Sequence, residues 1–247
     1  MKQQPMRVFL QDIPIDLIDR AQLVERITGW LRHPEQHHQV VTLNALMLVK
    51  SNQEQLLQQI IREASLVMVD GFGIELLLRH RGYQTVSRLA GVDLVRLLIA
   101  WCAEHAVPVA CFGGPAQLPP MLGQALAKQW PSLNIGGLWD GSDWQRRQAA
   151  IVAALKQGGP CLLLAGLGTP AQEIFLARAL PDLPGTVGIG VGGALEVIAG
   201  VKKEAPPLIR HGGWEWAYRM IREPERLKNI PKLIRFWARY FVWERSR

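Results

Sequence analysis

The stretch VMVDGFGIELLLRHRGYQTVSRLAG, residues 67–91, decides how we expect the chain to fold. It continues an apolar run, Leu66–Val69, that has the length of a buried strand, and it breaks at Asp70-Gly71-Phe72-Gly73. A helical pattern with apolar residues at positions 74, 77 and 78 follows at once. A carboxylate at the C-terminal end of a parallel strand lies where ligands bind in open α/β sheets, so we expect Asp70 to face a substrate.

Outward from this stretch, apolar runs of strand length alternate with helical patterns. After a hairpin (8–10 and 13–17) we expect strands at 40–43, 66–69, 107–112, 133–135, 161–165 and 186–191. Helices are expected at 19–31, 45–63 (capped by Asn44), 73–81, 92–104, 117–129, 144–156, 171–180 and 194–199. Such alternation predicts βαβ crossovers, and hence an α/β fold with a parallel sheet and helices on both faces. It leaves the strand order open.

The cysteines and the apolar segments indicate a cytosolic protein. Cys102, Cys111 and Cys161 lie far apart in or beside apolar segments, without CxxC spacing, and we expect them to be reduced core residues. The N-terminal stretch lacks an apolar run of signal-peptide length. No segment approaches the roughly 20 apolar residues of a membrane span.

The positive charge is concentrated near the C-terminus. Residues 202–247 hold twelve Lys and Arg against five Asp and Glu, whereas residues 1–201 hold sixteen of each sign. Four of the nine tryptophans also lie after residue 201. We therefore divide the chain into a neutral α/β domain, 1–201, and a basic, aromatic-rich helical appendage, 202–247.

Residues 228–243 of the appendage form a two-sided pattern. Basic residues recur on one side of the expected helix, at 228, 232, 235 and 239, and Ile, Leu, Trp, Tyr and Phe occupy the other, at 230, 233, 234, 237, 240 and 241. A basic amphipathic helix with aromatic residues is typical of segments that lie on an anionic membrane surface. The alternative is a terminal helix packed on its own domain with its lysines in water.

Glycines follow three of the expected strands, at 113–114, at 166 and 168, and at 192–193. They leave backbone amides accessible near helix N-termini, which suits phosphate or diphosphate groups. Tight turns without a ligand are the alternative. A hydride-transfer dinucleotide is disfavoured, because Gly166-Leu167-Gly168 lacks the third glycine of GxGxxG.

Polar residues also gather at the expected strand ends: Thr42, Asn44, Asp70, Arg88 and Gln172. In a parallel sheet they converge on one edge. Each has a structural alternative as a cap or turn residue. The chain has no GxSxG, P-loop, DxD pair or plausible Cys-His pair, which disfavours serine hydrolases and kinases.

An ordered series of motifs resembles the WecG/TagA/CpsF glycosyltransferase family. The series is Thr42-x-Asn44, Asp70-Gly71-x-Gly73, Arg88-x-x-Gly91, Phe112-Gly113-Gly114, Gly166-x-Gly168-x-Pro170-x-Gln172-Glu173, Val191-Gly192-Gly193, Ala205-Pro206, Glu215-Trp216-x-Tyr218-Arg219 and Glu223-Pro224-x-Arg226. The resemblance runs from about residue 40 to the end of the chain. It implies a Rossmann-like fold and an inverting transferase that needs no metal or other cofactor.

The resemblance also implies substrates and site residues. The donor is a UDP-sugar, the acceptor is a saccharide on polyprenyl diphosphate, and the enzyme is attached peripherally to the inner face of the plasma membrane. Asp70 is the expected general base, and the other expected substrate contacts are Thr42, Asn44, Arg88, Gln172, Arg219 and Arg226. We place the nucleotide at Gly114, Asp140, Gly141, Gly168, Gln172 and Gly192.

This chain departs from the family pattern where cations are usual, with Ala171, Glu204 and Asn229 in their place. The transferred sugar stays open among N-acetylmannosamine, its uronic acid, and glucose or glucuronate, and a homo-oligomer is possible. Two rival hypotheses are a nucleotide-binding protein whose basic tail binds nucleic acid, and an NAD-linked oxidoreductase. The transferase hypothesis predicts no nucleic-acid partner.

Overall fold

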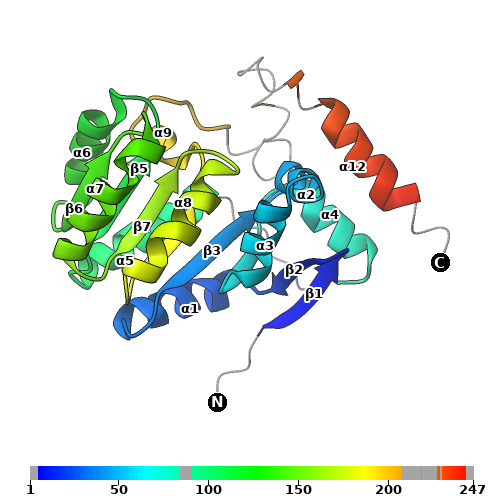
Figure 1. The fold of residues 1–247 in the computed structure, drawn as a ribbon, viewed down its shortest axis with the longest axis horizontal. Coiled ribbons are helices and arrows are strands. Elements are labelled where there is room, and N and C mark those ends of the chain that lie inside the picture. The colour runs from blue at the N-terminus through cyan, green and yellow to red at the C-terminus, as the bar shows by residue number, and fades with distance from the viewer. Residues whose placement is uncertain (1–4, 84–90, 207–217, 219–226, 229, 243–247) are drawn as a thin grey trace.

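A six-stranded sheet forms the centre of the protein (Figure 1). The computed structural model describes residues 5–83, 91–206, 218, 227–228 and 230–242, the side chains of 239–242 excepted. All neighbouring strands of this sheet run parallel, which confirms the predicted class. In spatial order the strands are β4 (Leu66–Val69), β3 (His38–Leu43), β8 (Val187–Gly190), β7 (Leu162–Gly166), β5 (Val109–Gly113) and β6 (Ile135–Trp139).

Helices cover both faces of the sheet, so most of its strands are apolar on both sides. One face packs against α1 (Arg20–Arg32), α5 (Gly91–Glu104), α6 (Leu118–Gln129) and α9 (Ala194–Ile198). The other packs against α2 (Ala45–Ser51), α3 (Gln55–Glu63), α4 (Phe72–His80), α7 (Trp144–Gly158) and α8 (Ala171–Ala179), which a short 3-10 turn at Leu180–Asp182 extends. Along β3, for example, Val40 belongs to the first core and Val41 to the second.

The N-terminal hairpin protects the β4 edge of the sheet. Its strands β1 (Met6–Leu10) and β2 (Ile13–Leu17) are antiparallel. Asp16 is buried and accepts hydrogen bonds from the Arg7 guanidinium, at 2.7 and 2.8 Å, and from the backbone N–H of Val67 in β4, at 2.8 Å. Since an unpaired strand edge invites aggregation, this side-chain cover is a structural role for a buried carboxylate.

Two sequence-based boundaries are wrong. The helix expected over 45–63 is two helices, α2 and α3, separated at 52–54. The strand expected at 133–135 is β6, which lies at Ile135–Trp139 and contains two glycines that weaken the strand pattern. The remaining expected elements within the described residues are present with small shifts at their ends. The three cysteines are free and buried, and burial raises the pKa of Cys102 and Cys111 to about 12, in agreement with their expected core role.

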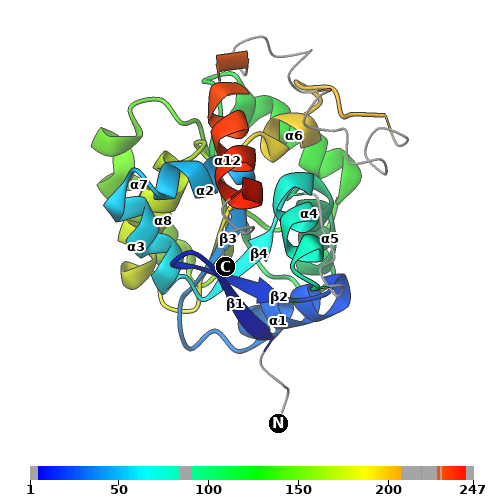
Figure 2. The ribbon, with the colours of Figure 1, turned by 90° about the vertical axis from the view of Figure 1, so that its right-hand side faces the viewer.

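Helix α12 (Ile230–Val242) packs on the same face of the molecule as α2 and α4 (Figure 2). Phe236 is 1% exposed and Trp237 is partly buried, whereas Ile230 and Ile234 are 38% and 62% exposed. The apolar side expected for this helix is therefore divided: Trp237 faces the domain together with Phe236, and the two isoleucines face solvent. No helix among the described residues is both long enough and apolar enough to span a bilayer.

Candidate active site

Asp70 and Asn44 lie side by side at the ends of neighbouring strands. The backbone N–H of Asp70 donates to the carbonyl of Leu43 at 2.8 Å, which continues the pairing of β4 with β3. A Cβ atom placed on Gly71 would lie 3.7 Å from the Cβ of Asn44. Asn44 caps α2, because its side-chain oxygen accepts from the N–H of Met47 at 3.0 Å, and this bond leaves its amide N–H groups for another partner.

Thr42 is buried within the sheet. Its hydroxyl donates a 2.7 Å hydrogen bond to the carbonyl of Gly190 and so ties β3 to β8. With 5% of its surface exposed, the position of Thr42 supports a role in holding two strand ends together. A direct contact with substrate stays a prediction.

On the side of β3 away from β4, the ends of β8, β7, β5 and β6 carry a row of glycines. The N–H of Gly114, after β5, donates to the carbonyl of Gly166 at 3.1 Å, and the N–H of Gly141, after β6, donates to the carbonyl of Gly114 at 2.8 Å. A Cβ atom on Gly166 would lie 2.9 Å from the carbonyl oxygen of Gly192. A side chain is therefore excluded at Gly166, and backbone hydrogen bonds link the ends of β7, β5 and β6 along this edge.

Two glycines of this edge face open space. Gly168 has φ 74° and Gly192 has φ 52°, a left-handed backbone that favours glycine. A Cβ atom on either would meet no atom of the described residues within 4 Å. They follow the neighbouring strands β7 and β8, whose next helices, α8 and α9, leave to opposite faces of the sheet. Ligands of open α/β sheets bind outside the strand ends at points where the chain changes direction in this way.

Gln172 and Glu173, at the start of α8, form a buried pair behind these glycines. The Gln172 side chain accepts from the N–H of Gly192 at 3.0 Å and donates to one carboxyl oxygen of Glu173 at 2.7 Å. Both side chains are at most 3% exposed. Gln172 therefore fixes the loop after β8 from inside the protein, and its predicted contact with the donor stays a prediction.

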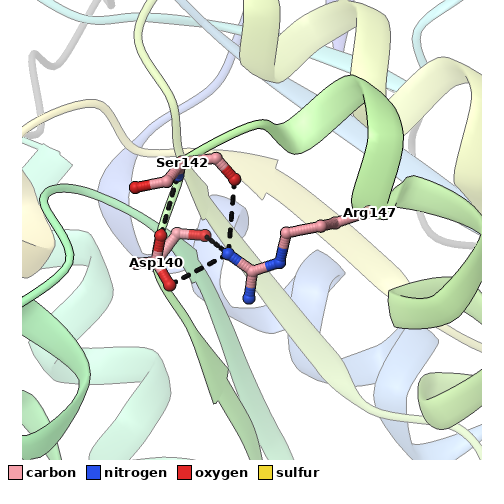
Figure 3. A network of polar contacts seen from close by, with 3 residues as sticks. All are labelled: Asp140, Ser142 and Arg147. Carbon is pink, nitrogen blue, oxygen red and sulfur yellow. Dashed lines mark hydrogen bonds and ion pairs between the residues drawn. The ribbon is translucent and has the colours of Figure 1, made fainter.

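Asp140 follows β6 and takes part in a local network (Figure 3). One of its oxygens accepts from the N–H of Ser142 at 2.8 Å and the other from the guanidinium of Arg147 at 2.9 Å. Hydrogen bonds from Ser142 and Arg147 lower the pKa of Asp140 to about 2. These contacts shape the turn into α7, and the nucleotide contact predicted for Asp140 is untested by them.

Several predicted site residues lie outside the described residues. They are Arg88, Arg219 and Arg226, and the same holds for Asn229. Glu204, one of the departures from the family pattern, is described: it forms a two-pronged ion pair with Arg96 of α5, at 2.9 and 3.0 Å. Its negative charge thus has a partner inside this chain.

Sequence reasoning missed two features of the site. Lys50, in the last turn of α2, reaches the loop before α8, where its Nζ donates to the carbonyl of Thr169 at 2.7 Å. The ring of Trp237 in α12 approaches Gly73, three residues after Asp70, within 3.7 Å of a Cβ atom placed there. Neither contact has a local sequence signal, because each joins segments more than 100 residues apart.

No group of three or more His, Cys, Asp and Glu side chains in the described part of the chain is arranged to hold a metal ion. Independence from metal stays a prediction.

A comparison with known protein families shows which family the chain belongs to. Residues 8–247 match the glycosyl transferase WecG/TagA/CpsF family. The chain belongs to this family. As a WecG/TagA/CpsF glycosyltransferase, it acts in cell-surface polysaccharide synthesis, with a nucleotide-sugar donor and a lipid-linked acceptor as its general substrate classes. The match includes the appendage as well as the α/β domain, so the basic tail is part of the transferase.

Proposed function

We propose that the chain is an inverting transferase that moves a sugar from a UDP donor to a saccharide carried on polyprenyl diphosphate. The observation that supports this most directly is the position of Asp70. It follows β4 next to Asn44, at the same edge of the sheet as the open glycines Gly168 and Gly192. A carboxylate for the acceptor and a backbone-lined edge for the diphosphate thus share one side of the sheet.

In the proposed reaction, the acceptor hydroxyl oxygen bonds to the anomeric carbon while the bond from that carbon to the UDP diphosphate breaks. Asp70 takes the hydroxyl proton as the new bond forms. UDP leaves with the bonding electrons, and its negative charge is stabilised by backbone N–H groups at the strand ends and by the arginines at 88, 219 and 226. Attack from the face opposite the leaving group inverts the anomeric centre.

Replacing Asp70 by asparagine tests the general base. We expect Asp70→Asn to lower turnover about 10²-fold or more while UDP still binds, since positioned bases contribute at least this much. The matched control is Asp182→Asn, which removes a carboxylate from an exposed site on the turn after α8. Turnover of Asp70→Asn within about threefold of wild type would contradict the assignment.

The outer side of α12 supports attachment to a membrane surface. Within α12, Ile230 and Ile234 are 38% and 62% exposed, and Arg235 is exposed beside them. Leu227, 49% exposed, and the exposed Lys228 precede the helix. Apolar side chains next to cations suit the boundary of an anionic bilayer. We therefore propose peripheral attachment to the inner face of the plasma membrane through α12.

The transferred sugar is best identified by screening. Incubation with UDP derivatives of N-acetylmannosamine, its uronic acid, glucose and glucuronate, with a short-chain polyprenyl-diphosphate sugar as acceptor, should give UDP release with one donor well above the others. Release with none of them, from folded protein, would contradict the proposed donor class.

A further inference from the structure

We propose that Lys50 binds the diphosphate of the donor, at the loop that joins β7 to α8. This inference rests on the proposed function, because it takes the donor to be a nucleoside diphosphate sugar. Lys50 is partly exposed, and its ammonium group donates to the carbonyl of Thr169 at 2.7 Å. Thr169 directly follows the open Gly168, so the ammonium lies beside the backbone that we expect the diphosphate to approach.

The charge of Lys50 is not cancelled by an ion pair within the described residues. Other cations close to the strand ends have carboxylate partners: Arg147 pairs with Asp140 at 2.9 Å, and Lys202 pairs with Glu196 at 2.7 Å. The contact of Lys50 is instead with a neutral carbonyl. An ammonium group has three donors, so two remain for a phosphate oxygen.

The nearest carboxyl group on α8 does not remove this charge either. Glu173 is 1% exposed, and burial raises its pKa to about 7, although the nearby Lys50 charge acts in the opposite direction. A large fraction of Glu173 is therefore protonated at neutral pH. The positive charge of Lys50 is therefore largely available to attract a phosphate group at the strand ends.

The shape of the edge fits the same ligand. Gly168 and Gly192 leave the backbone accessible after two adjacent strands, and Ala171, the first residue of α8, brings no charge of its own. A diphosphate above these glycines would contact backbone N–H groups but would need a cation from another element. Lys50 supplies it from α2, on the other side of the loop.

Two ligands separate a phosphate contact from a structural role. We would measure UDP and uridine binding by calorimetry to wild type, Lys50→Met, Lys50→Arg and the control Lys156→Met, which removes an exposed lysine from the far end of α7. Loss of one charge-assisted phosphate contact predicts UDP affinity about tenfold or more lower in Lys50→Met, with uridine affinity unchanged. Lys50→Arg should recover most UDP affinity, and Lys156→Met should match wild type.

The outcomes distinguish this inference from the proposed function. If wild type binds UDP and Lys50→Met binds it equally well, Lys50 has no part in diphosphate binding and the proposed donor stands. If Lys50→Met weakens uridine and UDP to the same extent, Lys50 only supports the loop, and the inference is overturned. If folded wild type binds neither UDP nor uridine, both the proposed UDP-sugar donor and the Lys50 inference are contradicted.

Discussion

At the scale of single residues, the carboxyl group of Glu173 is the clearest departure from ordinary solution behaviour. One of its oxygens accepts from Gln172, and the other is buried without a hydrogen-bond partner among the described residues. Ionising such a group costs free energy, because water no longer solvates the charge. This burial is the main cause of its raised pKa, about 7 against an ordinary 4.5.

The raised pKa gives a pH dependence of known sign. Between pH 4.5 and pH 7 the native protein holds a proton on Glu173 that the unfolded chain has released, so the contribution of this group to stability falls as pH rises through that window. Glu173→Gln cannot titrate there. We expect its free energy of unfolding, relative to wild type, to increase by about 2 kcal/mol from pH 5 to pH 8.

Urea denaturation of both proteins at the two pH values measures this change. Glu54→Gln, at an exposed position, controls for the loss of one negative charge. The difference in free energy of unfolding between Glu173→Gln and wild type could instead stay constant from pH 5 to pH 8. That result would mean that Glu173 is already ionised in the native protein at pH 5, which would contradict the burial argument.

At the same scale, residues with a local signal could be predicted and residues that act across the fold could not. Asn44 was expected to cap a helix because its spacing from an apolar pattern is local, and it does so. In the sequence, Lys50 looks like an ordinary helix residue, and Glu173 belongs to a motif that does not indicate its burial. Their surroundings arise only when the chain folds: Lys50 of α2 then reaches the loop before α8, 119 residues further along the sequence, and Glu173 of α8 becomes buried.

At the scale of elements, Phe236 is the buried anchor of α12 on the α/β domain among the side chains that the structure describes. Phe236 is 1% exposed, stacks edge-on against Trp237 at 5.3 Å between ring centroids, and belongs to the core formed with α2 and α4. We expect Phe236→Ala to lower the free energy of unfolding by about 3 kcal/mol, because truncating a buried phenylalanine removes apolar contacts and leaves a cavity.

Chemical denaturation measures this cost, and Ile234→Ala is its control on the same helix. Ile234 is 62% exposed, so its truncation should cost well under 1 kcal/mol, as for other surface changes. If Phe236→Ala were no less stable than Ile234→Ala, α12 would not be anchored by this ring.

The element pattern was predictable where periodicity is long, as in the α/β alternation from 91 to 199. It failed where the pattern is short or mixed. Leu56 and Leu57 extend an apolar spacing through 52–54, yet the chain turns there and α3 begins again at Gln55. In α12, spacing alone could not tell Phe236, which the domain buries, from Ile234, which it does not.

At the scale of the whole molecule, α12 lies between the proposed membrane surface and the proposed general base, Asp70. The inner side of α12 meets Gly73, three residues from Asp70, and its outer side presents isoleucines and cations to the surroundings. A polyprenyl-linked acceptor held by a membrane under α12 would therefore meet the enzyme close to its proposed base. The excess positive charge near the C-terminus favours the same orientation on an anionic surface.

Flotation with vesicles tests this arrangement. Wild type should float with vesicles rich in anionic phospholipid, less with neutral ones, and less as salt rises. Ile230→Asp/Ile234→Asp should lose most of this binding, because both charges enter the surface that faces the bilayer. Leu56→Asp/Met121→Asp puts the same two charges at exposed apolar sites on α3 and α6 and should float like wild type.

Measuring RNA binding by the same variants tests the rival hypothesis that the basic tail binds nucleic acid. Nucleic-acid binding would depend on salt as well, since phosphate contacts release counterions, but it would not depend on isoleucine. Tight RNA binding by wild type, retained in Ile230→Asp/Ile234→Asp and without flotation on any vesicle, would overturn the membrane orientation. Flotation that requires both isoleucines and anionic lipid would instead place α12 at the bilayer surface, as the proposed membrane attachment requires.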